Sequence, residues 1–161
     1  MSVMTKSARP VTVQFDENWT NILERAAGEV FEMMAGTHLP PYPAPPEEPK
    51  SELTAMVGLA GALCGMMTIR CSHKTSVKLA SLMLGEGAAS GPSTARDAIG
   101  ELCNMVAGNF KAKISTHCML SVPTVISGES YSLNTAEPTQ NATIVLSFEG
   151  DPLWITLVVH S

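Results

Sequence analysis

The sequence contains one eleven-residue pattern twice, at positions that lie 72 residues apart. The first copy, AAGEVFEMMAG, covers residues 26–36, and the second, AIGELCNMVAG, covers residues 98–108. Six of the eleven positions are identical, and both copies have the apolar spacing of an amphipathic helix. A repeated helical unit predicts an internal duplication in which two equivalent helices lie on one shared core.

Local signals place further elements around the two copies. The first helix is predicted to start at Asp16 or Asn18, which are good N-cap residues, and to stop at Gly36. A hairpin is predicted over residues 53–71, with its turn near Gly61. Two more helices are predicted, one over residues 75–84 and one that is capped by Ser93 or Thr94 and ends about Lys113. The remaining predicted elements are strands over residues 119–122, 125–131, 142–148 and 153–160, of which the last two are joined by the tight turn EGDP. This order predicts an α+β fold of two layers, with the helices packed on one antiparallel sheet.

The length of 161 residues fits one compact domain. Residues 1–14 are predicted to form a flexible N-terminal arm, and residues 15–161 a single domain. Residues 39–50 contain six of the eleven prolines, so this stretch is predicted to be a stiff, extended surface loop.

Two classes of partner are disfavoured by composition. Residues 53–69 carry no charge, but the stretch is shorter than the roughly 20 residues that a membrane-spanning helix needs. Its glycines at 58, 61 and 65 favour a buried hairpin, so no membrane contact is expected. The net charge is −5 and no basic run exists, which argues against nucleic-acid binding, since such binding needs clustered lysines and arginines.

The four cysteines, Cys64, Cys71, Cys103 and Cys118, form no CxxC pair. They are interpreted as free thiols packed as small hydrophobes in a reducing compartment, and a cytoplasmic protein is expected. The four histidines show no HExxH spacing, so no metal site is expected. A Ser–His–Asp or Cys–His site stays open without geometry.

A helical wheel separates the second copy into two faces. One face carries the apolar stripe Ile99, Leu102, Cys103, Val106 and Phe110. The opposite face carries Asp97, Glu101, Asn104 and Gly108. Such a face can be ordinary solvated surface, but it carries few charges for that role.

The first copy differs from the second on the outward face. It keeps Glu29 at the place of Glu101 but has Glu32 at the place of Asn104. Two copies that share a scaffold and differ in their outward residues suggest one working site and one altered site.

The second helix resembles the signature helix of a known family. Residues 97–114, DAIGELCNMVAGNFKAKI, are similar to the helix of the CheC/CheX/FliY phosphatases, and residues 121–128, SVPTVISG, resemble the segment that follows in CheX. Asp97, Glu101, Asn104 and Pro123 match the family pattern in order, with Pro123 closer to the Asn than in CheC. Only one helix keeps the Glu–Asn pair, so the resemblance is closest to CheX.

The resemblance implies an enzyme that hydrolyses the aspartyl phosphate of a CheY-like response-regulator receiver domain. Glu101 and Asn104 are then the catalytic residues, and Asp97, Gly100, Gly108 and Pro123 contact the partner. The chain needs no cofactor of its own, because Mg²⁺ is expected in the receiver. A homodimer is also implied.

Two other functions fit the same resemblance. The chain can be a receiver-binding or scaffold module of a two-component or flagellar system, without useful turnover. It can also be a structural motor-switch domain related to FliY. In the scaffold case, mutating Asn104 would leave the phosphate lifetime of the receiver unchanged. Association with flagellar components would support the motor-switch case.

Overall fold

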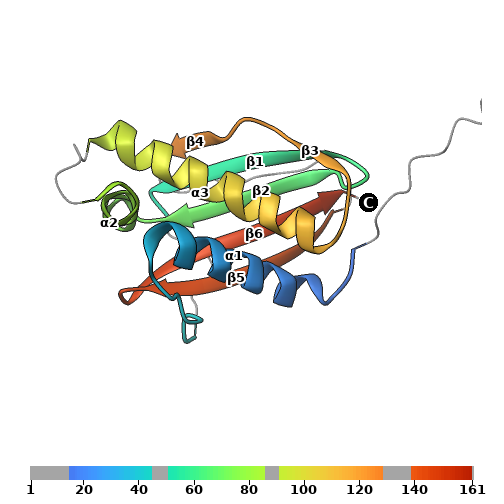
Figure 1. The fold of residues 1–161 in the computed structure, drawn as a ribbon, viewed down its shortest axis with the longest axis horizontal. Coiled ribbons are helices and arrows are strands. Elements are labelled where there is room, and N and C mark those ends of the chain that lie inside the picture. The colour runs from blue at the N-terminus through green and yellow to red at the C-terminus, as the bar shows by residue number, and fades with distance from the viewer. Residues whose placement is uncertain (1–14, 45–50, 86–90, 129–138, 161) are drawn as a thin grey trace, which may run out of the picture.

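The fold has one layer of helices on one layer of sheet (Figure 1). The computed structural model describes residues 15–44, 51–85, 91–128 and 139–160. Helices α1 (Trp19–Ala35) and α3 (Pro92–Lys113) lie side by side on one face of the sheet, and α2 (His73–Leu84) lies at one end. The α+β class predicted from the sequence is confirmed.

The described strands form one antiparallel sheet. Its strands are β1 (Leu53–Gly61), β2 (Gly65–Cys71), β3 (Cys118–Leu120), β4 (Thr124–Ser127), β5 (Thr139–Phe148) and β6 (Asp151–His160). Their order is β3-β1-β2-β6-β5, and β4 pairs with the same edge of β1 as β3. The hairpins β1–β2 and β5–β6 therefore meet at the centre of the sheet, through β2 and β6.

The arrangement of helices on hairpins fits an internal duplication. Hairpin β1–β2 follows α1 along the chain, and hairpin β5–β6 follows α3. Each helix, however, packs on the hairpin that follows the other helix: α3 lies on β1 and β2, and α1 lies on β5. Two equivalent helices thus share one sheet, as the repeated pattern predicts.

The core lies between the helix layer and the sheet. The apolar stripe predicted on α3 is fully buried, and so are Leu23, Ala27 and Phe31 of α1. The Trp19 ring of α1 packs edge-to-face on Phe110 of α3, with ring centroids 5.6 Å apart. The two helices are therefore joined to one another as well as to the sheet.

Several predicted element ends are wrong by a few residues. Helix α3 starts at Pro92 rather than after Ser93 or Thr94, because proline needs no backbone N–H partner in the first turn. Helix α2 starts at His73, where the side chain of Ser72 accepts a hydrogen bond from the Thr75 backbone N–H at 3.1 Å. Strand β3 ends at Leu120, and β4 begins only after Pro123.

The turn between β5 and β6 is confirmed. Glu149 and Gly150 form it, both with positive φ, which matches the twist of a two-residue hairpin. In the proline-rich stretch, Pro41 forms a bridge to Leu146 of β5. Residues 45–50 and the predicted arm, 1–14, lie outside the described residues.

The uncharged stretch at residues 53–69 is a hairpin, as predicted. No helix in the described parts of the chain is long and apolar enough to cross a membrane. Cys71, Cys103 and Cys118 are buried as predicted, but Cys64 is exposed in the β1–β2 turn. Burial raises the pKa of Cys71 and that of Cys103 to about 12.

The buried thiols predict an alkaline loss of stability. Folded Cys103 keeps its proton up to a pKa of about 12, whereas an ordinary thiol loses it near 9.0. The folded state therefore binds more protons between these values, and stability falls as the pH rises above 9. Cys103→Ala is expected to flatten the pH dependence of unfolding free energy by up to about 1.4 kcal/mol per pH unit. Urea melts from pH 8 upward measure this, with Cys64→Ala as the control; equal slopes in the two variants would contradict it.

Adding a methyl group at two glycines, Gly65 and Gly28, is expected to have opposite effects on the stability of the fold. A Cβ at Gly65 would lie 2.0 Å from the carbonyl oxygen of Val158, so the backbones of β2 and β6 would have to separate. A Cβ at Gly28, inside α1, would meet nothing within 4 Å. Gly65→Ala is expected to destabilise the fold by about 3 kcal/mol or more. Gly28→Ala is expected to stabilise it by roughly 0.5–1 kcal/mol. Thermal unfolding of the two variants tests both signs.

Candidate functional site

Helix α3 presents its polar residues on the side away from the sheet. Burial of Ile99, Leu102 and Val106 against the sheet fixes the rotation of the helix about its axis. Glu101 is exposed and Asn104 is half-buried, on the opposite side. The two faces predicted from the helical wheel are therefore confirmed.

The segment from β3 to β4 runs alongside this polar face. At Gly100, a Cβ would lie 3.3 Å from Val125 Cγ2 and 3.4 Å from Pro123 Cβ, so the absent side chain allows a close approach. At Gly108, a Cβ would lie 3.8 Å from Leu120 Cδ1, which is ordinary contact. Asn104 is one helical turn from each glycine, so it lies beside the middle of this segment.

Hydrogen bonds hold the segment in place at Ser121. The Ser121 backbone N–H donates to the Gly58 carbonyl at 2.9 Å. The Gly58 N–H donates in turn to Ser121 Oγ at 2.8 Å. Ser121 is thereby fixed to the edge of β1, and Pro123 is held over Gly100.

A shallow depression of about 270 Å³ lies between α3 and β4. It is lined by Arg96, Asp97, Gly100, Glu101, Pro123 and Val125. Four residues predicted from the sequence thus come together here, while Asn104 and Gly108 continue the same helical face beyond it. Gly100 is buried beneath Pro123, so a partner would meet Pro123 rather than the glycine.

Sequence reasoning missed two of the lining residues. Arg96 lies one turn before Gly100, so the helical wheel could have found it. Its Nε donates to the Pro92 carbonyl at 3.3 Å, which keeps it on the helix. Val125 could not be found, because only the pairing of β4 with β1 brings it to the helix.

The two copies of the repeated helix differ in how their glutamates are engaged. Glu29 of α1 accepts hydrogen bonds from Asn109 Nδ2 at 2.9 Å and from Lys113 Nζ at 2.8 Å. These two hydrogen bonds hold the pKa of Glu29 below its usual value, and the one from Asn109 has the larger effect. Neither Glu101 nor Asn104 makes a side-chain hydrogen bond or ion pair with any other described residue. Among the described residues, the polar atoms of Glu101 and Asn104 are therefore not engaged by the chain itself.

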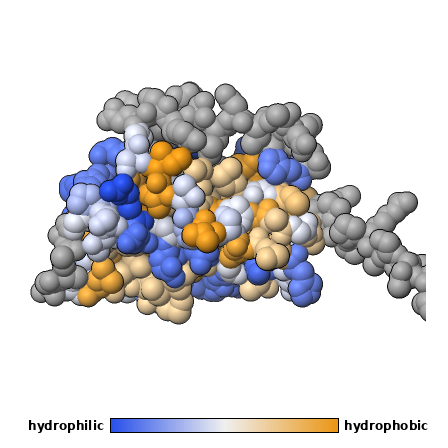
Figure 2. All heavy atoms as spheres, turned by 90° about the horizontal axis from the view of Figure 1, so that it is seen from above, coloured by the Kyte–Doolittle hydropathy of each residue, from blue (hydrophilic) through white to orange (hydrophobic). Residues whose placement is uncertain are grey.

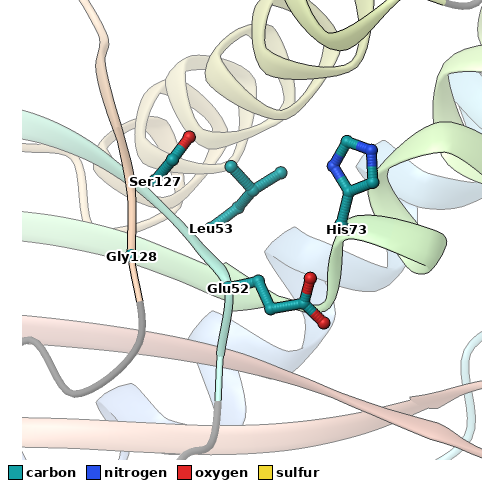
Figure 3. Close-up of a pocket in the computed structure, with 5 residues that line it drawn as sticks. All are labelled: Glu52, Leu53, His73, Ser127 and Gly128. Atoms are coloured by element: carbon teal, nitrogen blue, oxygen red, sulfur yellow. The ribbon is translucent and has the colours of Figure 1, made fainter.

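A second cavity, of about 290 Å³, holds residue types that occur in hydrolytic sites (Figure 3). Glu52, His73 and Ser127 line it together with Leu53 and Gly128. Figure 3 shows the side chain of Leu53 between Ser127 and the His73 ring. No hydrogen bond among described residues links these three polar side chains, so they form no proton relay. Within the described chain, no cluster of His, Cys, Asp or Glu could hold a metal ion.

Comparisons with solved structures find the same fold. Chemotaxis protein CheX from Vibrio vulnificus has a TM-score of 0.76 at 20% identity, with 92% of this chain and 100% of that chain covered. The CheX–CheY–BeF3–Mg²⁺ complex from Borrelia burgdorferi has a TM-score of 0.74 at 18% identity, with 92% of this chain and 100% of that chain covered. FliY from Thermotoga maritima has a TM-score of 0.58 at 15% identity, with 92% of each chain covered.

The CheX structures are thus more similar in fold than FliY. No curated protein matches the chain. The profile of the family described as chemotaxis phosphatase CheX matches residues 53–149, more than half of the sequence. That match includes all of α3 and its partner strands β3 and β4. The chain therefore belongs to the CheX family of chemotaxis phosphatases.

Proposed function

We propose that this chain hydrolyses the aspartyl phosphate of a CheY-like receiver domain and that Glu101 and Asn104 carry the reaction. The observation that carries this function is the contrast between the two repeated helices. Glu29 is engaged by Asn109 and Lys113, whereas Glu101 is exposed and has no partner among the described residues. Family membership and the complex of a CheX with CheY, BeF3 and Mg²⁺ support the substrate class.

Asn104 is proposed to position the attacking water. In the reaction the water oxygen bonds to phosphorus, the aspartyl carboxylate leaves, and the water proton passes to the phosphate product. The Asn104 amide can accept a hydrogen bond through Oδ1 and donate one through Nδ2 without adding charge. Phosphoryl transfer depends mainly on positioning and charge stabilisation, so a neutral amide is suited to this role.

Glu101 and Asp97 are proposed to orient the receiver. A carboxylate at position 101 can pair with the lysine of the receiver's own phosphorylation site, which sets the register of the helix. Asp97 lies one turn earlier and lines the same depression, where it can attract a basic residue of the partner. Gly108 and Pro123 complete the partner-contact face, and Gly100 contributes by allowing Pro123 to pack closely.

Mg²⁺ is proposed to enter with the receiver rather than with this chain. A homodimer and a cytoplasmic location also remain predictions. Sedimentation equilibrium of the purified chain measures the oligomeric state directly.

Replacing Asn104 is expected to abolish most of the phosphatase activity. Receivers from the same organism are radiolabelled on their aspartate, and loss of label is followed with and without the chain. Asn104→Ala is expected to lower kcat by roughly 100-fold, since the attacking water loses its position. Asn104→Asp is expected to be as inactive, because it places a negative charge toward the phosphoryl oxygens. If the wild-type chain binds a receiver without accelerating label loss, the scaffold function is correct instead.

The altered helix provides matched controls. Glu29→Gln and Glu32→Ala change acidic residues at the equivalent positions of α1, outside the proposed site. Both variants are expected to keep the wild-type phosphatase rate. Glu101→Gln is expected to raise the KM for the receiver by roughly 10-fold, since it loses a charge-assisted hydrogen bond. Equal effects at positions 29 and 101 would overturn the assignment of the site to α3.

A further inference from the structure

Two large hydrophobic side chains are almost fully exposed at the β3–β4 edge of the sheet: Val122 in the segment beside α3, and Met119 on the sheet face opposite the helices. Val122 is 84% exposed and Met119 is 78% exposed. They are the most exposed large hydrophobic residues in the described parts of the chain, ahead of Met33 on α1 at 69%. Figure 2, which looks onto this edge of the molecule, shows hydrophobic residues gathered among polar ones. An almost fully exposed apolar side chain beside the proposed site offers a contact that a partner can cover.

The backbone holds Val122 in a fixed position. On one side, Ser121 makes two hydrogen bonds to Gly58 of β1. On the other side, Pro123 packs against Gly100 of α3 and restricts the backbone of the residue before it. A rigid side chain loses little conformational entropy when a partner buries it. Val122 is thus preorganised for contact.

The segment that carries Val122 runs alongside the helix that bears the residues proposed to act on the phosphate. Leu120 lies at Gly108 and Pro123 lies at Gly100, so the intervening residues pass the level of Asn104, midway between the two glycines. A protein whose phosphoryl group reaches Asn104 therefore comes close to the segment that carries Val122. Covering this apolar edge would also exclude bulk water from one side of the reaction.

We propose that Val122 is an apolar contact that gives the receiver domain affinity for this chain. This role rests on the proposed function, because it takes the receiver as the occupant. The receiver surface it fits is an apolar patch beside the phosphorylated aspartate. The acidic side chains of Asp97 and Glu101 set the orientation of the receiver, while Val122 supplies buried apolar area.

The experiment separates binding from chemistry. Label loss is measured over a range of concentrations of each radiolabelled receiver, and the Kd is measured with the same receivers activated by beryllofluoride. Val122→Ala is expected to raise both KM and Kd by roughly 10-fold, and Val122→Asp by roughly 100-fold, through lost apolar burial and a desolvated charge. In both variants kcat is expected to stay within about 2-fold of wild type, as for a residue that acts in binding. Met33→Ala, an exposed hydrophobic on α1, is the matched control and is expected to change neither constant.

Each contrary outcome identifies a different error. If Val122→Asp leaves KM and Kd unchanged while Asn104→Ala still lowers kcat, the docking role is wrong and the phosphatase function stands. If Val122→Asp instead converts a dimer into a monomer in sedimentation with KM unchanged, the edge binds a second copy of this chain. If the wild-type chain neither binds nor dephosphorylates any receiver, both proposals fail together.

Discussion

The candidate site depends on the packing of one face of α3 against the sheet. Ile99, Leu102, Cys103, Val106 and Phe110 leave no surface exposed to solvent. Burying each large apolar side chain is worth about 1.5–3 kcal/mol, so rotating the helix by one residue would forfeit several such contributions at once. Glu101 and Asn104 therefore keep their direction through the core beneath them. They need no hydrogen bonds of their own to be aimed, which leaves their polar atoms available to a partner.

A second constraint acts on the other side of the helix. The segment between β3 and β4 reaches the polar face only because position 100 has no side chain, with neighbours at 3.3 and 3.4 Å from where a Cβ would be. Ser121 fixes this segment to β1, and β1 packs beneath α3. The same strand thus positions both the helix and the edge that lies beside it. The candidate site is therefore formed by α3, β1 and the segment between β3 and β4 together, rather than by α3 alone.

The sequence was sufficient for those features that are periodic along one helix. The phase of α3, and with it the outward direction of Glu101 and Asn104, followed from apolar spacing, and the resemblance to the CheX family led to the correct fold. Features that need two elements at once could not be predicted. Val125 reaches the depression only through pairing of β4 with β1, and Cys64 is exposed only because it lies in the β1–β2 turn. The start of α3 was missed because Gly91 and Pro92 together begin a helix without a side-chain cap.

The asymmetry between the two repeated helices has a physical explanation in their shared packing. Asn109 and Lys113 belong to α3 itself, on the side that faces α1, and both donate to Glu29. Glu29, the glutamate retained in the first copy, therefore joins the two helices at the surface, while the Trp19–Phe110 contact joins them in the core. Its neighbour Glu32 would bring a second negative charge toward any phosphoryl group placed there, where the second copy has a neutral amide. The first copy thus differs from the second in that its outward glutamate joins the two helices, whereas Glu101 and Asn104 make no such contact with other described residues.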